Sequence, residues 1–72
     1  MSDDAPTLYW DTSYEIVLSL MEQYPEIDVE QLGLQDLSRR IVALPGFADD
    51  PALVNDQILR DILREWYEEI TA

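Results

Sequence analysis

The chain has 72 residues, of which sixteen are acidic and four are basic, and its formal net charge is −12. A chain of this length predicts one domain, whose folding buries about 60% of the surface that the unfolded chain exposes. Cysteine and histidine are both absent, which excludes disulfide bonds, thiolate or imidazole metal ligands and catalysis by a histidine base. A strongly negative surface repels nucleic acid and anionic lipid, and it attracts basic protein surfaces or cations. We therefore expect neither a nucleic-acid-binding protein nor a membrane protein.

The net negative charge is concentrated in the first half of the chain. Residues 1–38 contain nine acidic residues and no basic one, because the four arginines are Arg39, Arg40, Arg60 and Arg64. Acidity can serve solubility alone, but this one-sided distribution favours a surface for a basic partner or a cation. No apolar run approaches a membrane span, and no basic region precedes an apolar segment at the N-terminus, so we expect a soluble cytoplasmic protein.

The first predicted helix follows a short N-terminal extension. Residues 1–8 are largely polar and are predicted to be disordered, which leaves 9–72 as the single domain. Thr12 followed three residues later by Glu15 fits a capping box, and the helix runs to about Tyr24, because a proline follows. The apolar face of this helix consists of Ile16, Val17, Leu20 and Tyr24.

An acidic stripe on this helix is the best candidate for a functional surface. At 3.6 residues per turn, Glu15, Ser19 and Glu22 lie opposite the apolar face, and Glu26 continues the line just beyond the helix end. The like charges repel one another, which reduces the stability of the helix a little. The alternative interpretation is a plain solvated face.

The middle of the chain predicts a brief turn and a second helix. Asp28 with Gln31 caps the turn, which Gly33 ends. The second helix spans residues 36–44, with Asp36 at the end where the helix dipole favours an acid. Arg39 and Arg40 are expected on its outside, exposed or in local salt bridges. The apolar seam consists of Leu37, Ile41 and Leu44.

A loop then leads to the last helix. Phe47 is predicted to anchor the core, and Asp49-Asp50-Pro51 is a turn signal. The adjacent carboxylates of Asp49 and Asp50 offer oxygen ligands to a hard cation, but we favour a structural role as turn or cap. Residues 52–54 are predicted to be a short extended piece.

The stretch from Asn55 to Ile70 predicts the longest helix, and the rest of the chain is organised around it. Asn55 is a good N-cap, and Arg64 can pair with Asp61 and Glu68 on the polar face. The apolar face is too wide to contact water, so the upstream helices must cover it. Its residues are Ile58, Leu59, Ile62, Leu63, Trp66 and Ile70.

The sequence contains no recognisable catalytic motif. It has no glycine-rich phosphate loop, no nucleophile beside a base and no EF-hand spacing. A carboxylate pair performs acid–base chemistry only in a desolvated cleft, which we do not expect in so small a domain. The sequence therefore predicts an all-α, compact three-helix domain that acts as an acidic binding module, not as an enzyme, and that is a monomer.

Three segments of the chain are specific in their order and spacing: the Tyr-Pro-acid-apolar-Asp segment from Tyr24, the Phe-x-Asp-Asp-Pro turn from Phe47, and the Asn-x-x-Ile-Leu start of the last helix. With Trp10, Glu15-Ile16, Asp36-Leu37, Leu44, Ile62-Leu63 and Trp66, they extend over Tyr9 to Glu69. In these residues the chain resembles the IscX family, small acidic proteins encoded with the bacterial iron–sulfur cluster assembly machinery.

The resemblance implies a fold like a winged helix with a reduced wing. It also implies binding to the cysteine desulfurase of this machinery, on a basic surface that frataxin also uses, and modulation of desulfurase activity and cluster formation. Weak iron binding through exposed carboxylates is implied as well. The implied iron ligands are Glu15, Glu22, Glu26 and Asp28, and the implied partner-binding residues are these four with Asp36, Asp49 and Asp50.

The acidic stripe is thus indicated both by its charge and by the resemblance. Exposed carboxylates suit hard Fe³⁺ and, more weakly, Fe²⁺, and without histidine or cysteine the affinity is expected to be modest. The leading hypothesis is a binding regulator of the cysteine desulfurase, with iron as a weak secondary ligand and no tightly bound cofactor. The alternatives are an iron chaperone that donates metal to the cluster scaffold, and an acidic interaction module for another basic partner.

Overall fold

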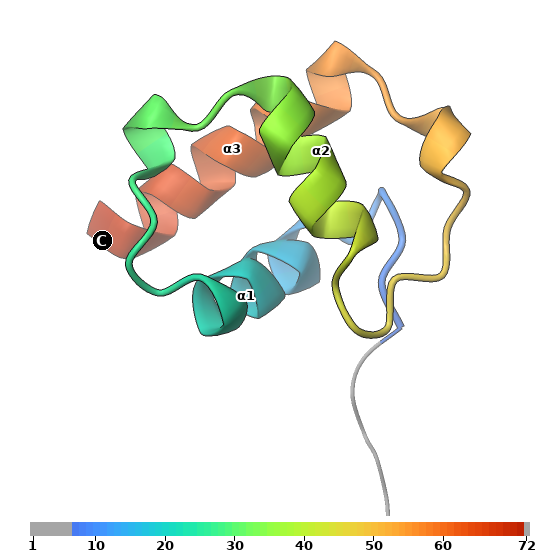
Figure 1. The fold of residues 1–72 in the computed structure, drawn as a ribbon, viewed down its shortest axis with the longest axis horizontal. Helices are drawn as coiled ribbons and strands as arrows, with labels where there is room; N and C mark the ends of the chain where they lie inside the picture. Colours follow the sequence, from blue (N-terminus) through green and yellow to red (C-terminus); the bar gives the residue numbers. More distant parts are fainter. Residues whose placement is uncertain (1–6, 72) are drawn as a thin grey trace, which may run out of the picture.

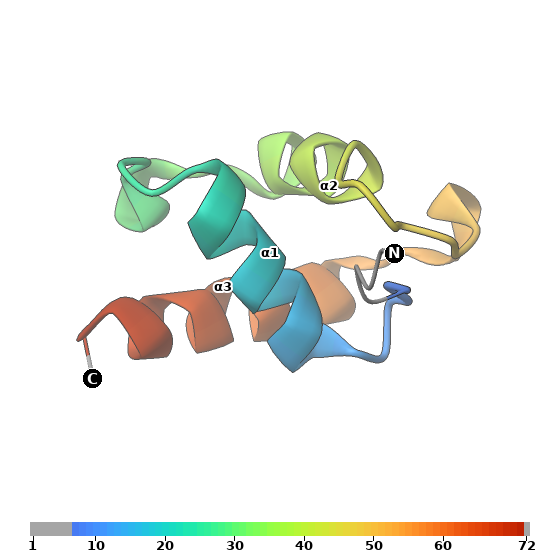
Figure 2. The same ribbon diagram turned by 90° about the horizontal axis from the view of Figure 1, so that it is seen from below.

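The computed structural model describes residues 7–71, which form three α-helices and two short 3-10 helices (Figure 1). Helix α3 runs along the longest dimension of the domain, while α1 crosses it obliquely and α2 packs against both (Figures 1 and 2). The elements in chain order are α1 (Ser13–Gln23), η1 (Val29–Gln31), α2 (Leu34–Val42), η2 (Pro51–Leu53) and α3 (Asp56–Thr71). The predicted all-α, three-helix architecture is confirmed for this part of the chain.

One hydrophobic core joins these elements. Helix α3 contributes Leu59, Ile62 and Trp66, each at most 5% exposed, as its helical spacing predicts. Burying a large apolar side chain stabilises the fold by roughly 1.5–3 kcal/mol, so these three residues are a main source of stability. The buried residues are Leu8, Trp10, Ile16, Val17, Leu20, Val29, Leu32, Leu37, Ile41, Leu44, Leu59, Ile62 and Trp66.

Side chains at two predicted caps take the predicted positions. The Asn55 Oδ1 atom accepts a hydrogen bond from the backbone N–H of Ile58 at 2.9 Å, at the start of α3. The Asp28 Oδ1 atom accepts one from the backbone N–H of Glu30 at 3.1 Å, which begins η1. Each bond satisfies a backbone donor that the first turn of a helix leaves free.

The N-terminal segment corrects the predicted domain boundary. Leu8, which was assigned to the disordered extension, is completely buried. Its N–H donates to the Gly46 carbonyl at 2.9 Å, and its carbonyl accepts from the Ala48 N–H at 3.0 Å, in a parallel bridge with Phe47. Gly46 has a φ of 90°, which a glycine adopts without steric strain. The domain therefore includes Leu8, and residues 1–6 of the predicted extension lie outside the described residues.

That bridge is isolated, and the described residues form no β-strand that would make a wing. The expected likeness to a winged helix is therefore not confirmed. No helix within residues 7–71 has the length and apolar content needed to cross a membrane.

Helix boundaries differ from the prediction at three places. Thr12 is the N-cap of α1, but its hydroxyl bonds to Tyr9 rather than to the helix, so the predicted capping box with Glu15 is wrong. Gly33 is the N-cap of α2, which begins at Leu34 and ends at Val42, two residues earlier than predicted at each end. Residues 51–53 form the 3-10 helix η2 and not an extended piece, because the Asp50 carboxylate caps the Ala52 N–H.

Three side chains are less buried or more buried than predicted. Ile70 is 50% exposed, because the last turn of α3 extends beyond the helices that cover its earlier turns. Phe47 is only partly buried, although its ring meets that of Trp10 edge to face, with centroids 5.0 Å apart. Arg40 is half-buried rather than outside, because its guanidinium carbon lies 4.7 Å from the centroid of the Tyr24 ring.

Candidate functional site

The predicted acidic stripe lies on the solvent side of α1. Glu15 and Glu22 are exposed on the helix, and Glu26 is exposed in the turn that follows it. The side chains of the three make no hydrogen bond or ion pair with another residue in the described part of the chain. We call these three residues the acidic face. Its carboxylates are free to meet an incoming cationic group.

Two large side chains beside the acidic face were missed by the sequence reasoning. Tyr14 is 48% exposed and Leu18 is 43% exposed, although both stand on an amphipathic helix whose core side is well filled. Residues three and four apart are neighbours on a helix surface, so Leu18 adjoins Tyr14, Glu15 and Glu22. The signal was present in the sequence, because an apolar residue at position 18 interrupts the polar side of the helix.

Two other predicted partner-binding acids already have local contacts. Asp28 is exposed and caps η1. Asp36 forms an ion pair with Arg39 at 3.0 Å, between side chains that are 46% and 76% exposed. An exposed pair of this kind contributes about 0–1 kcal/mol, and the local salt bridge predicted for Arg39 is confirmed.

The carboxylate of Asp49 fastens the N-terminal segment to the loop after α2. Its Oδ2 atom accepts a hydrogen bond from the Trp10 N–H at 2.9 Å, and its Oδ1 atom accepts one from the Asp50 N–H at 2.8 Å. The carbonyl of Asp50 accepts the indole N–H of Trp10 at 2.8 Å. The Asp50 carboxylate instead caps η2 through the Ala52 N–H. These contacts confirm the structural role favoured for both residues, and the Asp49 carboxylate and the Asp50 carbonyl together form a clasp around Trp10.

The donor chemistry of the acidic residues suits iron, but their arrangement does not assemble a metal centre. Carboxylate oxygens are suitable ligands for hard cations. Within residues 7–71, however, no three acidic side chains are grouped so that they could hold one ion. The structure therefore does not bring the predicted iron ligands together. These ligands are Glu15, Glu22, Glu26 and Asp28.

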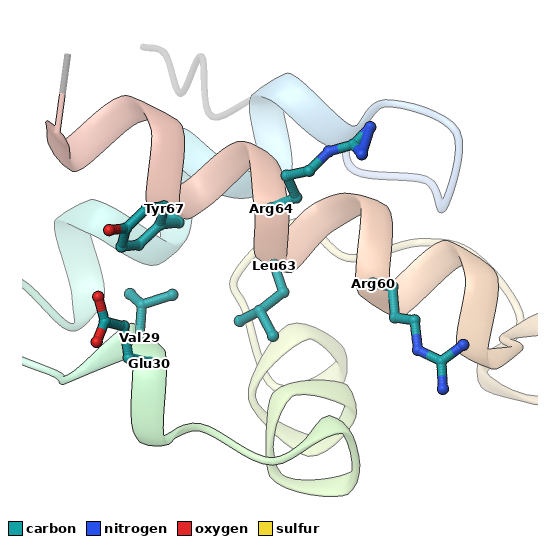
Figure 3. A pocket seen from close by; sticks show the side chains of 6 residues that line it. All are labelled: Val29, Glu30, Arg60, Leu63, Arg64 and Tyr67. Atoms are coloured by element: carbon teal, nitrogen blue, oxygen red, sulfur yellow. The ribbon is translucent and has the colours of Figure 1, made fainter.

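A groove of about 390 Å³ lies between η1 and α3 and was not predicted. Figure 3 shows Leu63 and Tyr67 of α3 opposite Val29 and Glu30 of η1. Arg60 and Arg64 line the same groove, but the side chain of Arg64 extends away from Leu63 (Figure 3). Neither arginine is in an ion pair with another described residue, so the pairing predicted for Arg64 with Asp61 and Glu68 is not present.

These features define a small acidic three-helix domain whose exposed α1 surface combines free carboxylates with apolar side chains. The sequence profile of the iron–sulphur cluster assembly family matches residues 8–71, so the match begins at the residue with which the core begins. The chain is also 38% identical over 63 residues to an uncharacterized protein of Pseudomonas aeruginosa, covering 88% of this chain and 96% of that protein. The chain belongs to the iron–sulphur cluster assembly family, and the predicted IscX-type membership is confirmed.

Proposed function

We propose that this protein is an accessory factor of iron–sulfur cluster assembly that binds the cysteine desulfurase through the acidic face and modulates cluster formation. In this proposal it is a binding protein and not an enzyme. The observation that carries the proposal is the acidic face itself, whose three carboxylates are exposed and unpaired among the described residues. Membership of an iron–sulphur cluster assembly family supports a partner within that machinery.

The charge distribution favours a basic partner surface. The acidic face lies in a part of the sequence, residues 1–38, that contains no basic residue, and none of its carboxylates forms an ion pair within the described part of the chain. Complementary charge accelerates encounter and selects the partner more than it adds affinity. In this proposal, the field of the acidic face steers the protein toward a basic surface on the desulfurase.

The test is a titration of isotopically labelled protein with the cysteine desulfurase, followed by NMR at low and high salt. We expect the amides of Glu15, Glu22 and Glu26 to broaden first, and salt to reverse the effect because screening weakens charge pairs across an exposed interface. Reversing Glu15 and Glu22 to lysine should weaken binding at least roughly tenfold, which corresponds to about 1.4 kcal/mol.

A charge-matched control is available on the outer face of α3, where Glu68 is exposed. Glu68→Lys changes the net charge by the same amount as Glu15→Lys alone, so the comparison of these two single variants measures the general loss of negative charge. Equal weakening by the α1 and α3 substitutions would mean that overall charge, and not the acidic face, directs binding. Absence of any spectral change at low salt would overturn the proposal.

Iron is the secondary part of the proposal. Single exposed carboxylates bind Fe²⁺ or Fe³⁺ weakly, and other divalent ions should compete. An anaerobic titration with Fe²⁺ should give a weak isotherm that a mild chelator abolishes completely and that Glu15→Gln with Glu22→Gln reduces. Iron that survives the chelator would favour the alternative in which the protein delivers metal to the cluster scaffold.

A further inference from the structure

Two exposed apolar side chains lie next to the acidic face on α1. Tyr14 and Leu18 are one helical turn apart and are 48% and 43% exposed. Leu18 stands three residues after Glu15 and four residues before Glu22, so the two carboxylates flank it along the helix. We call Tyr14 and Leu18 the apolar pair.

Two other exposed apolar residues, which serve as comparisons, lie in a different setting. Leu53 is 59% exposed on η2, and Tyr67 is 41% exposed beside the two arginines that line the groove on α3. Scattered apolar side chains on a surface are normal and need no explanation. The apolar pair differs because it lies on a helix without a basic residue and is bordered by the unpaired carboxylates of Glu15 and Glu22. The charge around the pair is therefore of one sign and favours a basic partner.

Protein interfaces commonly have an apolar centre, often with tyrosine, and a polar rim. The α1 surface has this composition, with the apolar pair beside the carboxylates of Glu15 and Glu22. The carboxylates select a basic partner surface, whereas burial of the apolar pair removes its exposed carbon from water and slows dissociation.

The acidic face and the apolar pair together are called the docking face. We propose that Tyr14 and Leu18 form its apolar centre, and that the partner surface presents apolar contact area between its basic side chains. This inference rests on the proposed function, because the partner is taken to be the cysteine desulfurase. It assigns separate roles to the two parts of the face: the acidic face governs association, and the apolar pair governs dissociation.

The experiment measures association and dissociation rates of the protein with the cysteine desulfurase by surface plasmon resonance at several salt concentrations. Tyr14→Ala and Leu18→Ala, singly and together, are compared with Tyr67→Ala and Leu53→Ala as residue-matched controls at other exposed sites. The double variant should dissociate roughly tenfold faster or more, because the loss of anchoring side chains at an interface mainly increases the dissociation rate. The salt dependence of its association should be unchanged. Glu15→Lys with Glu22→Lys should instead slow association and flatten its salt dependence.

The outcomes separate this inference from the proposed function. If the double variant binds like the unaltered protein while the lysine variant binds weakly, the apolar centre is overturned and the acidic docking face stands. If Tyr67→Ala and Leu53→Ala accelerate dissociation equally, the effect is not local and the inference is also overturned. Failure of the unaltered protein to bind overturns both. Far-UV circular dichroism of each variant verifies the fold, which substitutions at exposed positions should not change.

Discussion

The contacts of Asp49 confirm the structural role predicted for its carboxylate and extend it beyond the local turn. An Asp-Asp-Pro turn offers two adjacent carboxylates, which is the composition expected of a weak cation site. In the fold, both oxygens of Asp49 accept backbone hydrogen bonds, from Trp10 and Asp50. The residue therefore connects two segments that lie 39 positions apart in the sequence.

Replacing Asp49 by alanine should destabilise the protein by about 1.5–3 kcal/mol, because hydrogen bonds to a charged group are lost and the Trp10 N–H is left partly buried without its partner. Urea unfolding at neutral pH measures the change. Asp49→Asn keeps an acceptor and should lose less. Asp11→Ala, at an exposed acid on the same segment, is the control and should change stability by no more than about 0.5 kcal/mol. A fully stable Asp49→Ala protein would contradict the clasp.

At the scale of the element, α1 uses its two sides for different purposes. Ile16, Val17 and Leu20 pack into the core, and this side was predicted from periodicity. The opposite side was predicted to be acidic, which its exposed glutamates confirm, but Tyr14 and Leu18 were not recognised there. A periodic pattern identifies which residues a helix can bury, whereas the exposure of an individual apolar residue depends on whether another element covers it.

Helix α3 gives the same lesson at its C-terminal end. Its apolar spacing continues regularly to Ile70, so the sequence predicts burial of that residue together with Trp66. Trp66 is 1% exposed, whereas Ile70 is 50% exposed. The contrast arises because packing elements are shorter than α3 and leave its last turn uncovered (Figure 1).

At the scale of the whole molecule, the net charge of −12 has opposite consequences for folding and for docking. Like charges held close together in the folded state repel one another, and they move apart when the chain unfolds. Salt screens this repulsion, and it equally screens attraction between the acidic face and a basic partner. The same addition of salt should therefore stabilise the fold and weaken the complex.

Raising sodium chloride from 20 to 300 mM is accordingly expected to increase the free energy of unfolding. The melting temperature should rise by several degrees, since a gain of 1 kcal/mol in the free energy of unfolding corresponds to about 4–8 °C in a domain of this size. Thermal unfolding followed by circular dichroism measures the shift. A variant with Glu15→Gln and Glu22→Gln should show a smaller response, because part of the repulsion is removed. A melting temperature that falls with salt would show that attractive pairs outweigh the repulsion.

The sequence by itself determined the all-α class, the dominant third helix, the acidic face and the family, because helical periodicity, capping residues and charge are properties of neighbouring positions. The tertiary structure alone decided that Leu8 enters the core, that Asp49 fastens Trp10, that Ile70 is uncovered and that the apolar pair is exposed. Each of these depends on contacts, or on the lack of cover, between segments far apart in the chain. Local patterns carry no information about which distant segment will lie against a given side chain.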